Sequence, residues 1–329
     1  MSAAPASATA EPAPALSDPL RGAHALAELL RGRRFAVLSG AGLSVDSGIP
    51  DYRGPTTRHI ARSPVTHDEF VRSPEARRRY WARASRGYAA VAEARPNPAH
   101  RALAALERGG HVAGAITQNV DGLHQAAGSR RVVELHGSLH RVTCLGCGAG
   151  LPRAEVQARI AADNPGWLAG GGAAAPDGDA EVARAAQAAF APPTCAACGG
   201  ALMPDVVFFG GTVPKARAEG ARDLVASADG LLVVGSSLTV FSGYRFVRQA
   251  DRAGLPVAIV TLGHTRGHRH ATLAVDAPLG AVLPGVVGAL GLTPAGPATS
   301  PAPAVPGPPI PPPTPRRRRS RGRASRGRS

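Results

Sequence analysis

Short, continuous apolar runs alternate with amphipathic segments through the middle of the chain. The apolar runs span residues 35–38, 112–116, 131–135, 230–235 and 256–261. Segments with helical spacing span residues 100–108, 216–226, 244–253 and 281–290. Strands that are apolar throughout are typical of a parallel sheet covered by helices on both faces. The pattern predicts a doubly wound α/β fold with a Rossmann-like sheet, whose ligands bind beyond the carboxyl ends of the strands.

Three regions break this alternation. Residues 1–22 are rich in Ala and Pro, and residues 293–329 are Pro-rich and then Arg-rich. Neither end has enough apolar residues to offset the entropy lost on ordering, so we expect both to be disordered. The folded domain should then span residues 23–292. A stretch at about 140–204 also departs from the pattern and is predicted to be a small inserted module.

The formal net charge of +15 is concentrated at the carboxyl end of the chain, where residues 315–329 hold eight arginines and no acidic residue. Such a tail can contact acidic partners or nucleic acid by charge alone, although a purely solubilising tail explains it equally well. No apolar run reaches the roughly 18 residues of a membrane span, and the first residues do not resemble a secretory signal. We therefore expect no membrane contact and a cytoplasmic location.

All the cysteines fall in two Cys-x-x-Cys pairs, Cys144 with Cys147 and Cys195 with Cys198. Two such pairs complete a tetrahedral shell with no open position, which predicts one structural Zn²⁺ per chain. Four free thiols or a redox pair is the alternative. A nucleic-acid-binding zinc ribbon is a second alternative, although the module has little Arg and no aromatic platform for stacked bases.

Small residues follow the first apolar run and form a candidate dinucleotide-binding turn, because they let backbone N–H groups approach a pyrophosphate. The spacing differs from GxGxxG, and a plain strand–helix turn explains it equally well. The next residues offer an apolar contact, rigid turns and a guanidinium suited to phosphate or ribose. The proposed contacts are Gly40, Ala41, Gly42, Ile49, Pro50, Asp51, Tyr52 and Arg53.

Polar residues follow the second apolar run, where Gln118, Asn119 and Asp121 stand close together. Asn119 and Asp121 could supply the donor and acceptor that a carboxamide such as nicotinamide needs, or one of them could only cap a helix. After a later apolar run, Gly235, Ser236 and Ser237 suit an adenylate ribose or phosphate.

His136 follows the apolar run 131–135, at a predicted strand end facing the ligand crevice. The ordinary pKa of a histidine, about 6.5, suits a general base near neutrality. His124 and His140 flank it, and spacing alone does not choose among the three.

Together these residues resemble the sirtuin family. The motifs GAGLSVDSGIPDYR, TQNVDGLH, ELHG, the paired CxxC, PDVVFFG and VVGSSL occur in the family's order over roughly residues 24–291. RYWAR, NPGW, APDGD and SGYRF are similar to the class II subgroup that includes the mitochondrial sirtuin with lipoamidase and ADP-ribosyltransferase activity.

The resemblance implies an NAD-dependent protein lysine deacylase that uses NAD as co-substrate and releases nicotinamide and O-acyl-ADP-ribose. His136 would be the base, and Asn119, a second catalytic residue, would line the nicotinamide pocket with Asp121. The implied partners are acyl-lysine proteins. A mono-ADP-ribosyltransferase on the same site is the alternative, and a zinc-stabilised nucleic-acid-binding protein is a weaker one. The implied NAD site also takes in Val120, Thr261, Leu262, Gly263 and Leu279.

Two departures from the family pattern bear on substrates. Thr261 stands where relatives often have Asn, so one bidentate contact to NAD is replaced by a single hydroxyl. The loop after Arg53 is short and lacks the Tyr-x-x-Arg pair that relatives use for succinyl-type acyl groups. From this loop we expect neutral acyl chains.

Overall fold

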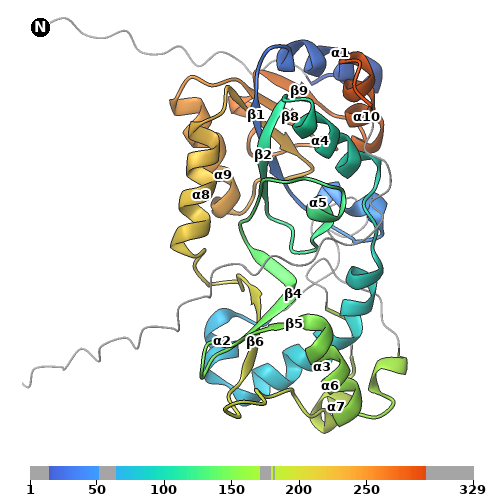
Figure 1. Cartoon of the computed structure of the whole chain (residues 1–329), viewed down its shortest axis with the longest axis vertical. Coiled ribbons are helices and arrows are strands. Elements are labelled where there is room, and N and C mark those ends of the chain that lie inside the picture. Colours follow the sequence, from blue (N-terminus) through green and yellow to red (C-terminus); the bar gives the residue numbers. More distant parts are fainter. Residues whose placement is uncertain (1–14, 52–63, 171–178, 181, 294–329) are drawn as a thin grey trace, which may run out of the picture.

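A six-stranded parallel sheet forms the larger part of the protein (Figure 1). This computed structural model describes residues 15–51, 64–170, 179–180 and 182–293. The strand order is β3-β2-β1-β7-β8-β9, which confirms the predicted Rossmann-like fold. The strands are β1 (Phe35–Ser39), β2 (Val112–Thr117), β3 (Val132–Glu134), β7 (Gly230–Val234), β8 (Val257–Val260) and β9 (Leu273–Val275).

Helices cover both faces of the sheet, as its continuously apolar strands require. One face packs against α1 (Pro19–Leu30), α4 (Pro98–Arg108) and α10 (Leu279–Ala289). The other face packs against α8 (Lys215–Ala226) and α9 (Phe241–Arg252). The short helix α5 (Leu123–Ala126) follows β2. Among the described residues, no helix is both long and apolar enough to cross a membrane.

The order of the strands reverses between β1 and its neighbour β7, and this is where doubly wound folds bind their ligands. From β1 the chain continues to β2 and β3 on one side, and later builds β7, β8 and β9 on the other. The turns after β1 and β7 therefore lie side by side. The Gly42 amide donates to the Gly235 carbonyl across this point, at 2.9 Å.

A smaller domain lies below the sheet in Figure 1 and is built on an antiparallel sheet of order β5-β4-β6. Its strands are β4 (Gly137–Cys144), β5 (Gly150–Pro152) and β6 (Leu202–Val206). Its helices are α2 (His67–Arg72), α3 (Pro74–Glu93), α6 (Arg153–Asp163) and α7 (Arg184–Ala189). We call this domain the zinc module.

The module takes in more of the chain than the predicted stretch of about 140–204. Its sheet already begins at Gly137 and extends to Val206, and α2 and α3 come from a separate stretch before β2. Phe70 of α2 and Trp81 of α3 are fully buried in the same core as Val142 of β4. This core is assembled from distant segments, so a boundary drawn on one run of unusual sequence misses part of it.

The predicted start of the folded part, residue 23, is also late. Helix α1 begins at Pro19, because Asp18 caps it by accepting from the amides of Leu20 and Arg21 at 2.8 and 3.2 Å. Leu16 also forms a parallel bridge with Val275 of β9. The remaining residues expected to be disordered, 1–14 and 294–329, lie outside the described part of the chain.

Candidate active site

A cavity of about 1370 Å³ lies between the carboxyl ends of the strands and the zinc module. Tyr52 and Arg53 lie outside the described residues. Every other residue predicted for the catalytic and NAD sites lines this cavity. These are Gly40, Ala41, Gly42, Ile49, Pro50, Asp51, Gln118, Asn119, Val120, Asp121, His136, Gly235, Ser236, Ser237, Thr261, Leu262, Gly263 and Leu279.

The turns after β1 and β7 pack too closely for side chains. A Cβ added to Gly42 would lie 2.9 Å from the Gly235 carbonyl oxygen, and one added to Gly235 would lie 2.4 Å from the Leu43 amide nitrogen. Gly235 also has a positive φ of 59°, which side chains disfavour. These glycines leave backbone groups exposed at the switch point, as a pyrophosphate site requires.

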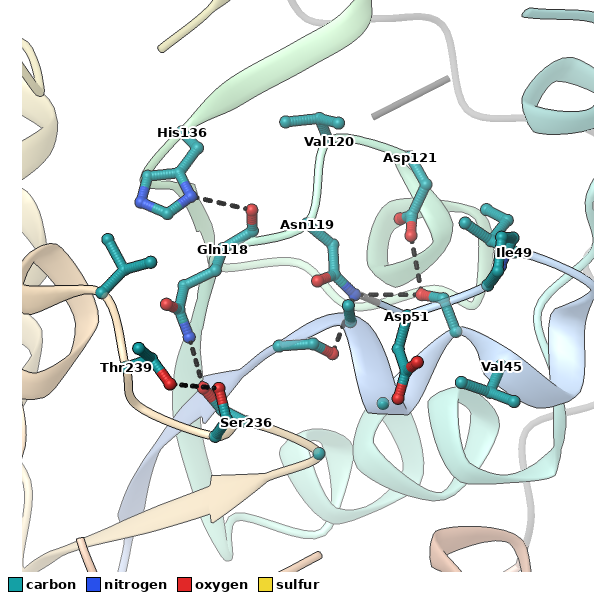
Figure 2. Close-up of a pocket in the computed structure, with 18 of the residues that line it drawn as sticks. Val45, Ile49, Asp51, Gln118, Asn119, Val120, Asp121, His136, Ser236 and Thr239 are labelled. Carbon is teal, nitrogen blue, oxygen red and sulfur yellow. Dashed lines mark hydrogen bonds between the residues drawn. The ribbon is translucent and has the colours of Figure 1, made fainter. Parts of the chain in front are cut away.

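The loop after β2 is held by hydrogen bonds to the first turn (Figure 2). The side-chain amide of Asn119 donates to the Gly40 carbonyl at 3.1 Å and to the Ser44 hydroxyl at 3.0 Å. Ser44 in turn donates to one carboxylate oxygen of Asp121 at 2.7 Å. The other oxygen of Asp121 accepts from the Leu123 amide at 3.0 Å. Asp121 therefore accepts from the first amide of α5 and also lines the cavity, whereas the N-cap position of that helix is Gly122 and has no side-chain cap bond.

The ring of His136 is held at both nitrogens. Nδ1 lies 3.0 Å from the carbonyl oxygen of Gln118, a contact drawn in Figure 2, and Nε2 lies 2.8 Å from the hydroxyl of Ser242. A carbonyl can only accept, so Nδ1 carries the proton of the neutral ring. Nε2 is then unprotonated, which is the state that a general base needs.

The pKa of His136 is lowered, chiefly by burial, which disfavours the charged ring. The guanidinium groups of Arg245 and Arg217 lower it further, while the Gln118 carbonyl raises it. The ring is therefore neutral, and able to accept a proton, at pH values near 7.

The structure distinguishes His136 from the two other histidines. His124 is 1% exposed, contacts the Ser39 hydroxyl at 2.8 Å, and has a pKa lowered to about 4 by burial. His140 contacts the Tyr88 hydroxyl at 2.9 Å and the Asp121 carbonyl at 2.8 Å. Neither lines the cavity, whereas His136 does. This placement supports His136 as the base.

One end of the cavity reaches into the zinc module, where Val65, Val91, Leu139 and Phe208 give it an apolar wall. Asp179 lines the same part, and its carboxylate pairs with Arg83 of α3 at 3.3 Å. This end is therefore suited to an apolar chain that finishes near a neutralised ion pair.

A Tyr-x-x-Arg pair, on whose absence the expectation of neutral acyl groups was based, does occur in the chain. A Tyr-x-x-Arg pair is absent from the loop after Arg53, but Tyr80 and Arg83 form one in α3. Tyr80 lines the cavity, while the charge of Arg83 is offset by Asp179. The pattern was missed because α3 was not predicted. Its apolar face is made of Ala and aromatic residues among many arginines, although residues 76, 80, 84, 88 and 91 show helical spacing.

The four cysteine sulfur atoms meet in the zinc module and lie within 4.8 Å of one another. The Cys144 and Cys198 sulfurs are 3.5 Å apart, and those of Cys147 and Cys195 are 3.8 Å apart, so neither pair is a disulfide. The Gly146 amide lies 3.3 Å from the Cys144 sulfur, a contact that stabilises a thiolate. This donor set fits a structural Zn²⁺ that cross-links the two Cys-x-x-Cys turns.

An ion-pair network joins the two domains beside His136. Arg141 of β4 pairs with Glu134 of β3 at 2.6 Å and with Asp205 of β6 at 2.9 Å. Asp205 also accepts from Arg217 of α8 at 2.6 and 2.7 Å. The network ties β3, which leads to His136, to the module and to a helix of the large domain.

Two residues of the site, Ser44 and Ser242, were not predicted from the motifs. Ser44 links Asn119 to Asp121, and Ser242 contacts His136. Ser44 stands inside the first Gly-rich motif and Ser242 inside SGYRF, but nothing in either pattern indicates which distant side chain each one meets.

Comparisons with known proteins agree with this geometry. A model of the Sir2 family matches residues 40–242. NAD-dependent protein deacetylase 1 of Streptomyces coelicolor is 52% identical over 275 residues, which cover 84% of this chain and 92% of that protein. The mitochondrial NAD-dependent protein lipoamidase sirtuin-4 of Bos taurus is 47% identical over 255 residues, covering 77% of this chain and 81% of that protein.

A solved structure of Sir2 with a p53 peptide and NAD⁺ aligns with a TM-score of 0.64 at 31% identity, covering 81% of this chain and 98% of the other. The family model and the relatives confirm the resemblance carried by the motifs. The chain belongs to the Sir2 family.

Proposed function

We propose that this protein is an NAD-dependent protein lysine deacylase that releases nicotinamide and O-acyl-ADP-ribose. One observation carries the proposal: the unprotonated Nε2 of His136 stands in the same cavity as the glycine turns of β1 and β7 and the apolar wall of the module. A base, a dinucleotide cradle and a channel for an acyl chain therefore share one space. The deacetylase and lipoamidase relatives support this assignment.

Each group of residues has a separate task. The turns at Gly40–Gly42 and Gly235–Ser237 hold the phosphates and adenylate ribose through backbone and hydroxyl groups. Asn119 and Asp121 form the wall against which the nicotinamide carboxamide binds. Nε2 of His136 removes a proton from a ribose hydroxyl, which then attacks the activated acyl group. The four cysteines would hold a Zn²⁺, which would supply a structural cross-link.

The test is peptide-dependent nicotinamide release, with the products identified by mass spectrometry. We expect an acetyl-lysine peptide to yield free lysine and O-acetyl-ADP-ribose, and His136→Ala to lower turnover by about 10²- to 10⁴-fold while the chain stays folded. Turnover that is unchanged in this variant would remove His136 as the base. ADP-ribose left covalently on protein, with no O-acyl-ADP-ribose, would instead identify a mono-ADP-ribosyltransferase.

We also propose a preference for neutral acyl groups, supported by the carboxylate of Asp179 in the acyl end of the cavity. A carboxyl-bearing acyl group would face that charge, since Arg83 is already paired with it. In a peptide panel, acetyl and propionyl groups should be removed faster than glutaryl. Asp179→Asn should reduce the difference in rate between the neutral acyl groups and glutaryl. A wild-type preference for glutaryl would contradict the proposal.

We further propose that the Arg-rich tail binds acidic partners and that the protein works in the cytoplasm. The eight arginines of residues 315–329 support the first proposal, and the four reduced, metal-suited cysteines support the second. Truncation after residue 292 should keep turnover but remove salt-sensitive binding to polyanions. A full-length chain that binds polyanions through this tail but shows no turnover would favour the nucleic-acid-binding alternative. Fractionation of cells with an antibody to the protein tests the location.

A further inference from the structure

Ser242 is the second residue of α9, and its hydroxyl faces the base rather than solvent. It lies 2.8 Å from Nε2 of His136, and both residues line the cavity. The two residues are 106 positions apart in the chain. Since Gln118 holds Nδ1, this contact leaves the imidazole ring fixed at both nitrogens.

The neighbours of Ser242 bring α9 into this position. A Cβ added to Gly243 would lie 2.5 Å from the side-chain oxygen of Gln118, so the glycine lets α9 pack directly against the side chain of the residue whose carbonyl holds Nδ1. The Arg245 side chain donates to the Ser242 carbonyl at 3.1 Å and secures the first turn of the helix. Both contacts lie beside Ser242 at the start of α9.

We propose that Ser242 is a positioning residue for the base His136, which it keeps aimed into the cavity and assists during proton transfer. The proposal rests on the deacylase function. In the free enzyme the Ser242 hydroxyl donates to the lone pair of Nε2. When NAD binds, its ribose hydroxyl displaces the Ser242 hydroxyl from Nε2. The O–H bond of the ribose hydroxyl then breaks as an N–H bond forms at Nε2. The new N–H can donate back to the Ser242 oxygen, so Ser242 neither gains nor loses a proton.

This role matters because the surroundings otherwise oppose the charged ring. Burial and the guanidinium groups of Arg245, on α9, and Arg217, on α8, all lower the pKa of His136. The Gln118 carbonyl, after β2, favours the imidazolium. The hydroxyl oxygen of Ser242 stands where it can accept from Nε2 of the charged ring. A hydroxyl can donate to the neutral ring and accept from the charged one, which no apolar side chain can do.

The experiment compares Ser242→Ala, Ser242→Thr and Ser242→Val, because Thr and Val have the same shape and differ in the hydroxyl. Ser227→Ala is the control: it also removes a hydroxyl from the end of a helix, where Ser227 donates to the Leu224 carbonyl away from the cavity. Turnover, the KM for NAD and pH profiles are measured for each, with an acetyl-lysine peptide. The ¹H–¹⁵N spectra of the histidine side chains, with His136 assigned from His136→Ala, give the pKa and tautomer of His136.

We expect the Ala and Val variants to lose about 10-fold in kcat with little change in KM, the size of one hydrogen bond that acts on the base. The lower limb of their pH profiles and the pKa of His136 should move to lower pH. Thr should restore both. Equal behaviour of Thr and Val, or an unchanged His136 pKa in both Ala and Val, would overturn the proposal. A wild-type protein without deacylase activity would refute the proposed function, while the spectra would still decide whether Ser242 sets the pKa of His136.

Discussion

The parallel sheet and the zinc module are stabilised by different kinds of contact. The core of the sheet is mostly aliphatic, and strands β1, β7 and β8 are buried along their whole length. The module contains Arg153, which is fully buried, with its guanidinium 4.8 Å from the Trp81 ring and 4.5 Å from the Tyr88 ring. It also gathers four cysteine sulfurs around one point.

Because of this difference, mutations should destabilise the two domains in different ways. Apolar burial is non-directional and spread over many residues, so the sheet should lose stability gradually as side chains are truncated. A thiolate or a buried guanidinium depends on particular partners, and losing one leaves a costly group unpaired. Single changes should therefore unfold the module while the sheet persists.

The largest effect should come from removing the metal. Cys147→Ser, or a zinc chelator, should unfold the module and abolish turnover, because structural zinc sites contribute about 10–16 kcal/mol to folding. Zinc content by mass spectrometry should fall from one per chain, and protease should cut within residues 137–206. Full turnover in a zinc-free protein would show that the module does not depend on the metal.

Two core truncations should separate the domains. Phe246→Ala, in helix α9 where it packs against the sheet, should lower the free energy of unfolding by about 3–5 kcal/mol in one transition. Trp81→Ala should cost a similar amount and also lose the indole bond to the Leu202 carbonyl, which is 3.0 Å long. Here the module should unfold first, seen as zinc release at a denaturant concentration that leaves the circular dichroism of the sheet intact. Coincident transitions in both variants would mean that the domains unfold together.

Acid should weaken the sheet domain through its buried histidines. Burial lowers the pKa of His124 to about 4, whereas the unfolded chain binds the proton near 6.5. Stability from this site is complete above pH 6.5 and falls as the pH drops, by about 3 kcal/mol near pH 4. His100, also buried, has its pKa shifted in the same direction. In urea titrations between pH 7 and 5, the free energy of unfolding should fall less with pH in His124→Gln than in the wild type. An equal fall in both proteins would show that His124 is not the cause of the acid sensitivity.

The smallest effect should come from Thr261, which lines the cavity on the sheet side. Thr261→Asn restores an amide that can make two hydrogen bonds, and should tighten NAD binding about 5-fold, equivalent to about 1 kcal/mol. Calorimetry of NAD binding measures the change, with His136→Ala as a variant that prevents turnover. Weaker binding in Thr261→Asn would mean that the hydroxyl is already the better ligand.

The sheet could be predicted from the sequence more completely than the zinc module. The apolar runs that predicted β1, β2, β7 and β8 are local, because one continuous stretch decides whether a strand can be buried on both faces. Helix α3 and the wider extent of the module were missed, because their core joins segments such as those of Phe70 and Val142 that lie far apart in the chain.

The sequence by itself determined the parts that depend on local spacing. The two Cys-x-x-Cys pairs predicted that the four cysteines would meet, since two intervening residues let both sulfurs reach one ion. The small residues after β1 and β7 predicted two closely packed turns at one cavity, since a close backbone approach excludes side chains. The strand ends indicated which polar residues would converge.

Only the tertiary structure decided among chemically equal candidates. It selected His136 over His124 and His140 by leaving His136 in the cavity and occupying the others with buried partners. It brought Ser242 to the base across 106 positions of sequence. Such pairings depend on how helices pack on a sheet, and the hydroxyl or imidazole itself carries no sign of its distant partner.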